Sequence, residues 1–363
     1  MTSRVHNFTG GPSTLPLPVL QRIQEEFLDF QGIGASIVEI SHRTPQFEGV
    51  RAETEAMIKE LMELPTNYKV LFAVGGGVMQ MAMAPMNLIA TRPARKAAFV
   101  HTGIFTGRAI SEASKYGTAV VAASGEDSGF TKIPAVDASM VDEDASYLHI
   151  ALNNTVHGTQ FRTMPQANGI PLVGDATSEI LSRKIDVSPF GMIFAGFQKN
   201  LGVVGLSLVV VREDLLGHAV KETPKWMDCA ILDETDSMPS TTNPFTIYVC
   251  NLVLHWLKEQ GGVAAIEPIN VQKAARLYGV IDKTDFYVGH AHPDSRSNMN
   301  VTFNMATPEL EEKFVVEAEA QGLYSLKGHR ELGGIRASIY NALPMEWVEA
   351  LASFMEEFER RNG

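Results

Sequence analysis

Gly191–Arg212, with the sequence GMIFAGFQKNLGVVGLSLVVVR, decides the fold that we expect for this chain. It predicts a buried strand at Met192–Gly196, a polar turn that contains Lys199, and a second apolar strand at Leu206–Val211. A lysine between two buried strands is hard to solvate, and desolvation disfavours its ammonium form. Its amine is therefore a better nucleophile near neutral pH, as a Schiff-base lysine requires. A lysine on an exposed turn is the alternative.

An apolar run upstream, Gly169-Ile-Pro-Leu-Val-Gly-Asp175, ends in a single carboxylate. Asp175 precedes Lys199 by 199 − 175 = 24 residues, which leaves room for one strand, a connection and a second strand. Both residues would then lie at strand ends and could converge on one pocket. In enzymes that use pyridoxal 5'-phosphate (PLP), an acid pairs with the pyridinium nitrogen and a lysine holds the aldehyde as an imine. The pair favours a PLP site, although Asp175 could instead cap a helix that begins at Ala176.

Four motifs are distributed over the whole chain: Asn7-Phe-Thr-Gly-Gly-Pro12, Glu39-Ile-Ser-His-Arg43, Ala195-Gly-Phe-Gln-Lys-Asn-Leu-Gly202, and Gly328-His-Arg330 with Gly333-Gly-Ile-Arg-Ala-Ser-Ile-Tyr-Asn341. Together they resemble the phosphoserine aminotransferase family, class-V aminotransferases of fold type I. The resemblance implies a PLP-dependent homodimer whose active sites are built from both chains. It implies transfer of the amino group of L-glutamate to 3-phosphohydroxypyruvate, giving O-phospho-L-serine in serine biosynthesis. Bacterial members also aminate 3-hydroxy-4-phosphooxobutanoate in pyridoxine biosynthesis.

Composition narrows the class of protein. The net charge of −12 and the pI of about 5.3 disfavour long-range attraction to nucleic acid or to an anionic membrane. Two cysteines, Cys229 and Cys250, make a disulfide framework improbable, fit a reducing compartment, and show no metal-binding spacing. The first residues lack the apolar core of a signal peptide, and no run approaches 18 apolar residues. We expect a cytoplasmic protein without a metal site.

Strands alternate with helices over most of the chain, which indicates an α/β fold with a mostly parallel sheet covered on both faces. The resemblance implies fold type I, with seven strands in the large domain and a smaller α/β domain at the C-terminus. We expect an arm at residues 1–15, a large PLP-binding domain at 16–260, and a small domain at 261–363 that begins at Gly261-Gly262. We also expect a helix soon after Arg212 and a long polar connection at Lys221–Pro244.

A glycine run, Gly75-Gly-Gly-Val-Met-Gln80, follows a predicted strand and opens a helix, where backbone N–H groups can approach a phosphate. A strand–helix turn that needs small residues is the alternative. The resemblance assigns the cofactor phosphate to the backbone around Gly77 and Val78, although the family commonly has a basic residue in place of Val78. It assigns stacking on the cofactor ring to Phe105, where many relatives have tryptophan, and further cofactor contacts to Thr155 and Gln198.

The long connection contains Ser237-Met-Pro-Ser-Thr-Thr-Asn-Pro244. A loop of this length is more often functional than not. In the family its counterpart reaches the cofactor phosphate of the neighbouring subunit, and an ungapped alignment gives those places to Ser240 and Thr241. The family usually has Asn-Thr-Pro there, so Asn243 is a further candidate donor.

Basic residues gather near the C-terminus of this acidic chain, where Arg336 stands in an apolar strand-like context. A guanidinium binds a carboxylate through two parallel hydrogen bonds, whereas an outward-facing surface arginine is the alternative. The resemblance makes Arg336 the partner of the substrate α-carboxylate. It places His329 and Arg330, with His42 and Arg43 of the partner subunit, around the substrate phosphate. Gly10 stands where many relatives have a serine that contacts substrate.

Two other functions compete with this interpretation. The chain could be a fold-type-I aminotransferase for an unphosphorylated amino acid, such as an alanine–glyoxylate enzyme. It could also be a catalytically silent PLP-binding protein, which the presence of Lys199, Asp175 and the arginines disfavours.

Overall fold

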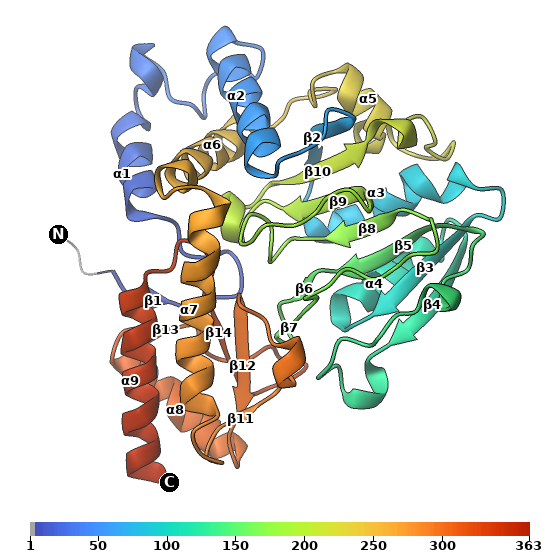
Figure 1. The fold of residues 1–363 in the computed structure, drawn as a ribbon. Coiled ribbons are helices and arrows are strands. Elements are labelled where there is room, and N and C mark those ends of the chain that lie inside the picture. Colours follow the sequence, from blue (N-terminus) through green and yellow to red (C-terminus); the bar gives the residue numbers. More distant parts are fainter. Residues whose placement is uncertain (1–3) are drawn as a thin grey trace.

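A seven-stranded sheet forms the centre of the larger part of the molecule (Figure 1). The computed structural model describes residues 4–363. The strands of this sheet are β2 (Tyr68–Val74), β3 (Lys96–His101), β4 (Thr118–Ser124), β5 (Ala145–Ala151), β8 (Leu172–Asp175), β9 (Phe190–Gly196) and β10 (Leu206–Arg212). Their order is β2-β10-β9-β8-β5-β3-β4, and only β10 runs antiparallel to its neighbours. The predicted α/β fold with a mostly parallel seven-stranded sheet is confirmed.

Helices cover both faces of this sheet, because alternate side chains of each strand point to opposite sides. In β2, Val70 and Phe72 belong to one apolar core, whereas Leu71 and Ala73 belong to another. The first core contains side chains of α2 (Pro45–Leu61) and α6 (Pro244–Glu259), against which α1 (Leu17–Glu26) packs. The second contains side chains of α3 (Gly77–Leu88), α4 (Ile104–Ala113) and α5 (Cys229–Glu234).

The C-terminal part of the chain has a sheet and an apolar core of its own. Its elements are α7 (Val263–Ile281), β11 (Val288–Gly289), β12 (Asn300–Asn304), α8 (Pro308–Ala320), β13 (Leu323–Tyr324), β14 (Ile335–Ser338) and α9 (Met345–Asn362). The strand order is β11-β12-β14, and α7 and α9 lie side by side (Figure 1). The division of the chain after residue 260 stays a prediction.

The N-terminal segment docks on this C-terminal part. Strand β1 (His6–Asn7) pairs in parallel with β13, and Phe8 is fully buried in the C-terminal core. Residues 9–13 then lead back to the large part of the molecule, where the Ser13 hydroxyl donates to the carbonyl of Lys199. The segment predicted as an arm therefore connects both parts of the molecule.

Two local predictions were wrong. The helix expected after Arg212 is one 3-10 turn, Glu213–Leu215, because Leu216 is extended and Gly217 takes a left-handed φ of 79°. The connection Lys221–Pro244 contains the short helix α5, whose first turn is capped by the Asp228 carboxylate accepting from the backbone N–H of Ala230. Within residues 4–363, no helix combines the length and apolar composition needed to span a membrane.

Candidate active site

One cavity of about 160 Å³ lies at the carboxyl ends of the parallel strands. It is lined by seven of the residues predicted from the sequence: Gly77, Val78, Phe105, Thr155, Asp175, Gln198 and Lys199. These residues follow or end strands β2, β3, β5, β8 and β9, so the sheet topology brings them together from five places in the chain. The predicted convergence of Asp175 and Lys199 on one cavity is what the structure shows.

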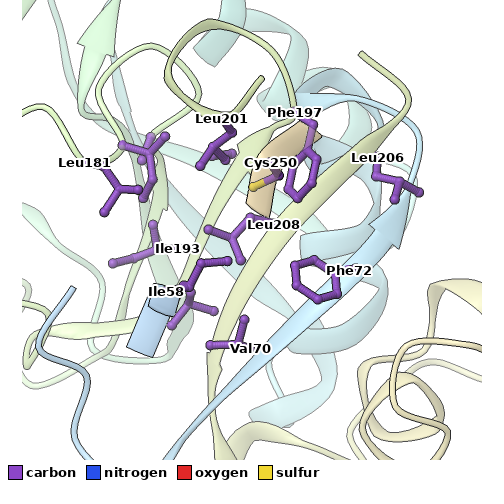
Figure 2. Packing of buried hydrophobic residues seen from close by; sticks show 14 of the residues in the cluster. Ile58, Val70, Phe72, Leu181, Ile193, Phe197, Leu201, Leu206, Leu208 and Cys250 are labelled. Carbon is purple, nitrogen blue, oxygen red and sulfur yellow. The ribbon is translucent and has the colours of Figure 1, made fainter. Parts of the chain in front are cut away.

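Lys199 lies in a tight turn between β9 and β10. Its backbone has a left-handed φ of 54°, and only 6% of the residue is exposed. The turn is held on either side by the buried side chains of Phe197 and Leu201, which belong to the core between the sheet and α6 (Figure 2). A non-glycine residue with such a backbone is strained and persists only where its surroundings fix it, which happens most often at functional sites.

The Lys199 amino group donates a hydrogen bond of 2.9 Å to the Thr155 hydroxyl. Burial lowers the pKa of Lys199 to about 8, while the Asp175 carboxylate acts to raise it and the Arg336 guanidinium to lower it. A substantial fraction of the amine is therefore neutral near pH 7.5, in which form it can attack a carbonyl carbon or accept a proton.

Asp175 ends β8, next to β9, and is 7% exposed. One carboxylate oxygen accepts a hydrogen bond of 2.9 Å from the backbone N–H of Thr177. Burial raises the pKa of Asp175, and the contacts with Thr177 and the charge of Lys199 oppose this change. A buried carboxylate of this kind gains from a cationic partner, such as a protonated ring nitrogen.

The N-terminus of α3 forms another wall of the cavity. The backbone is tightly packed here, since a Cβ atom on Gly77 would lie 2.5 Å from the Thr177 hydroxyl oxygen and one on Gly196 would lie 2.5 Å from the Gly77 nitrogen. Free N–H groups and the helix dipole make this terminus suitable for a phosphate. The side chain of Val78 is half exposed and offers no hydrogen-bond donor.

Phe105 stands in the first turn of α4, which begins after Gly103. The Thr106 hydroxyl accepts hydrogen bonds from the backbone N–H groups of Thr102 and Gly103, which fixes the start of the helix. The Phe105 ring lines the cavity and has the guanidinium carbon of Arg108 5.5 Å from its centroid. The ring therefore offers an aromatic surface at the wall of the cavity, and its stacking on the cofactor stays a prediction.

Arg336 lies on β14, where burial lowers its pKa and its Nε has no hydrogen-bond partner within residues 4–363. A Cβ atom on Gly10 would lie 2.5 Å from a terminal nitrogen of this guanidinium, so the glycine leaves the space that the guanidinium occupies. A partly buried guanidinium with an unused donor is suited to bind a carboxylate.

His329 and Arg330 lie outside the Lys199 cavity, in a groove beside α8. Burial lowers the pKa of His329, and the positive charges of Arg336, Arg330 and Arg108 lower it further, against the opposing charge of Glu331. Cationic groups therefore gather around His329, and Arg108 is one that the sequence did not indicate.

His42, Ser240 and Thr241 line a separate groove of about 600 Å³, together with Asn243. This groove shares no residue with the Lys199 cavity. The Arg43 side chain donates to the neighbouring His42 ring over 3.4 Å. The residues predicted from the sequence thus line three separate places within one chain, and those in the two grooves do not line the cavity that contains Lys199.

Several residues of the site were missed by the sequence interpretation. Asn153, Thr177 and Ser178 line the cavity, and Tyr340 places its ring centroid 5.8 Å from the Lys199 nitrogen. Thr177 follows Asp175 by two residues, a spacing at which an Asp side chain often accepts a backbone N–H, so that signal was present. The others depend on tertiary packing.

The donor set fits PLP. The cavity offers an amine for the aldehyde, a buried carboxylate for the ring nitrogen, an aromatic ring for stacking, and a helix N-terminus for the phosphate. The unpartnered Nε of Arg336 and the close glycine packing at the start of α3 fit an anionic ligand that approaches the backbone.

Comparison with known proteins agrees with this chemistry. The family model of class-V aminotransferases matches residues 5–351. A phosphoserine aminotransferase of Desulfotalea psychrophila is 49% identical over 362 residues, covering 100% of this chain and 99% of that relative. The solved phosphoserine aminotransferase of Bacillus circulans subsp. alkalophilus superposes with a TM-score of 0.95 at 44% identity, covering 99% of each chain. The PLP-bound phosphoserine aminotransferase of Trichomonas vaginalis gives 0.91 at 32% identity, covering 97% of this chain and 100% of that one.

The matched regions include the cavity, the long connection and the C-terminal part, because each relative covers almost the full chain. The chain therefore belongs to the class-V, PLP-dependent aminotransferases, and within them to the phosphoserine aminotransferase family.

Proposed function

We propose that this protein transfers the amino group of L-glutamate to 3-phosphohydroxypyruvate, giving O-phospho-L-serine and 2-oxoglutarate. The observation that supports this most is the joint placement of Lys199 and Asp175 in one buried cavity at the strand ends. PLP, when bound, supplies a carbonyl carbon for the amine and a ring that accepts electrons from the substrate Cα.

Lys199 binds the cofactor and moves protons. With a pKa of about 8, its amine is easily deprotonated near neutral pH and readily protonated again, as a group that both accepts and returns a proton must be. The Thr155 hydroxyl orients the amine. Asp175 supplies the negative charge that keeps a ring nitrogen protonated, and the Thr177 N–H holds that carboxylate in place.

The substrate anions are bound by the basic residues. Arg336 takes the α-carboxylate, because its guanidinium is near Lys199 and has an unused donor. His329 and Arg330 take the phosphate, because several cationic groups surround them. A phosphate dianion needs more donors than one side chain offers.

A homodimer completes the site in this proposal. His42, Arg43, Ser240 and Thr241 would serve the partner's cavity: His42 and Arg43 at the substrate phosphate, the other two at the cofactor phosphate. The position of these residues supports this assignment. His42 and the Ser240–Thr241 segment share one groove, which is separate from the Lys199 cavity of the same chain. Asn243 caps α6 by accepting from the Thr246 N–H with its carboxamide oxygen, which leaves its carboxamide nitrogen as a further candidate donor beside Ser240 and Thr241.

Spectroscopy of the half-reaction tests the activity. Addition of L-glutamate to the PLP-loaded protein is expected to convert the cofactor's absorption to that of the pyridoxamine form, and O-phospho-L-serine is expected to do the same. L-Serine is the matched control, since it differs only in the phosphate. A protein that responds to serine as well as to phosphoserine would be an aminotransferase for unphosphorylated amino acids, and a coloured protein that responds to neither would be catalytically silent.

Mixing two inactive variants tests the shared site. Lys199→Ala and Arg43→Ala homodimers are each expected to be nearly inactive. In an equal mixture whose subunits exchange, about half of the dimers contain one subunit of each variant, and one of the two sites in each mixed dimer is intact. The mixture should therefore recover about a quarter of the wild-type activity. No recovery after verified exchange would mean that Arg43 acts in its own chain.

We also propose that the protein aminates 3-hydroxy-4-phosphooxobutanoate, because the basic groups near His329 recognise a phosphate and not the rest of the carbon chain. Competition of the two oxo acids for the pyridoxamine form measures the preference. The cytoplasmic location expected from the cysteine content stays a prediction.

A further inference from the structure

Tyr340 lies against Lys199, and it belongs to the motif Gly333–Asn341, in which only Arg336 was assigned a role from the sequence. It follows β14 and is 2% exposed. The Lys199 nitrogen stands 5.8 Å from the centroid of its ring, within the range of a cation–π interaction. The groups that face this amine are thus the Thr155 hydroxyl, the Asp175 carboxylate, the Arg336 guanidinium and the Tyr340 ring.

The Tyr340 hydroxyl connects three parts of the molecule. It donates a hydrogen bond of 2.9 Å to the carbonyl of Gly10 in the N-terminal segment and accepts one of 3.1 Å from the Asn300 carboxamide on β12. Asn300 in turn accepts a hydrogen bond of 2.8 Å from Asn153, which lines the Lys199 cavity. Because the hydroxyl already has both a donor and an acceptor partner, it is poorly placed to transfer protons.

The residue after Tyr340 holds the lysine turn directly. The backbone N–H of Asn341 donates a hydrogen bond of 3.0 Å to the side-chain oxygen of Asn200, the neighbour of Lys199. The Asn341 side chain also donates to the carbonyl of Leu181, over 2.8 Å. Two consecutive residues of the C-terminal part therefore contact the lysine or its neighbour.

We propose that Tyr340 is a positioning residue for Lys199: its ring face favours the protonated amine, and its hydroxyl holds the N-terminal segment and the C-terminal part in place around it. The ring thus works with Asp175 and against burial and Arg336, which favour the neutral amine. It keeps the amine able to hold a proton between two transfers. This inference rests on the proposed role of Lys199.

The test is the pKa of Lys199 in the full-length protein stripped of PLP. Competitive acetylation with acetic anhydride from pH 6 to 11, read by mass spectrometry of the peptide that contains Lys199, gives this value without any turnover. Tyr340→Leu removes the ring and is expected to lower the pKa by about one pH unit. Tyr340→Phe keeps the ring and is expected to leave it within about 0.3.

The direction of the change separates this role from a general loosening of the structure. A loosened site admits water and lets Arg336 move away, and both changes raise the pKa of a buried lysine. The matched control is Tyr287→Leu, which removes a tyrosine that is equally buried in the C-terminal core and donates to the carbonyl of Met355. It is expected to lower the melting temperature and to leave Lys199 unchanged.

An unchanged or raised pKa in Tyr340→Leu overturns the proposal, as does a fall of equal size in Tyr340→Phe or in Tyr287→Leu. The loss of the hydroxyl is read separately, since Tyr340→Phe is expected to lower the melting temperature by freeing Gly10 and Asn300. The variants could show the expected changes in the pKa of Lys199 while the wild-type protein fails to transfer amino groups from glutamate. In that case the proposed activity is wrong and the positioning role stands.

Discussion

Lys199 and Lys273 are two buried lysines in one chain, and their surroundings differ. Lys273 lies on α7 and donates to three backbone carbonyls: that of Tyr340 at 2.8 Å, that of Leu343 at 3.3 Å and that of Asn341 at 3.5 Å. Lys199 has a single hydrogen-bond partner within the described residues, the Thr155 hydroxyl, and faces a cavity. Burial lowers both pKa values, to about 7 for Lys273 and to about 8 for Lys199.

The difference shows that burial alone does not make a lysine reactive. The Lys273 amino group is used to hold the turn from Tyr340 to Leu343, so this group is a structural cross-link between α7 and the end of β14. Lys199 keeps N–H bonds free toward a space where a ligand can enter. A strained backbone marks Lys199 as well, with φ of 54°, whereas Lys273 lies within a regular helix.

The largest effect expected is on activity at Lys199. Lys199→Ala is predicted to lower the rate of transamination by about 10³-fold or more, because one group both accepts and returns the proton. It is also predicted to raise the stability of the cofactor-free protein slightly, since a buried and poorly paired charge is removed. Steady-state kinetics and thermal unfolding measure the two effects, and retained activity would overturn the assignment of the lysine.

A smaller loss of activity is expected at the acid of the pair. Asp175→Asn keeps an oxygen for the Thr177 N–H but loses the charge, and the rate is predicted to fall by about 10²-fold.

The same variant is expected to change stability. Because the pKa of Asp175 is raised in the folded state, the folded state binds more protons than the unfolded state above pH 3.8. The carboxylate therefore lowers the free energy of unfolding as pH rises through the folded pKa. Asp175→Asn is therefore predicted to raise the melting temperature of the cofactor-free protein at pH 7. A variant with wild-type turnover would exclude a role for this charge.

Stability, and not chemistry, is expected to change at Lys273. Lys273→Met fills the same space but removes the Lys273 donor from the Asn341 and Leu343 carbonyls, while the Tyr340 carbonyl keeps the backbone N–H of Leu343. The free energy of unfolding is therefore predicted to fall by about 2 kcal/mol. Urea denaturation of the full chain measures this. The matched comparison is Lys199→Met, for which no such loss of unfolding free energy is expected. Equal losses for both variants would mean that both lysines have a structural role.

The sequence predicted the part of the site that depends on local patterns. Apolar runs ended by single polar residues gave the strand ends, and parallel strands in one sheet place such ends at one edge, so Asp175 and Lys199 were found together. Burial alone does not distinguish Lys199 from Lys273, since both are buried. The acid 24 residues upstream and the family motifs made that distinction.

The rest of the site depends on contacts between distant segments. Tyr340, Asn300 and Asn153 meet through side-chain hydrogen bonds that join residues at least 40 positions apart, and no periodicity signals such a pair. The helix predicted after Arg212 failed because Gly217 and the extended Leu216 end the first turn. The short helix α5 was missed because six residues are too few for a clear helical period.

His149 extends the comparison to a buried base without any partner. It lies in β5 between the rings of Phe99 and Phe194, with centroid distances of 5.4 and 6.1 Å, and neither ring nitrogen has a hydrogen-bond partner within residues 4–363. Burial lowers its pKa from 6.5 to about 3. Between these values the unfolded state binds the proton and the folded state does not, so the contribution of His149 to stability is lost as pH falls below 6.5.

The smallest effect is predicted here, and it depends on pH. In the wild type, His149 lowers the free energy of unfolding by about 1.4 kcal/mol for each pH unit below 6.5, and His149→Phe should remove this loss. The free energy of unfolding of the variant minus that of the wild type should therefore be about 2 kcal/mol larger at pH 5 than at pH 7.5. Urea denaturation at the two pH values measures this difference. Parallel pH profiles for wild type and His149→Phe would mean that the imidazole is protonated inside the fold, against the burial that the two phenylalanine rings impose.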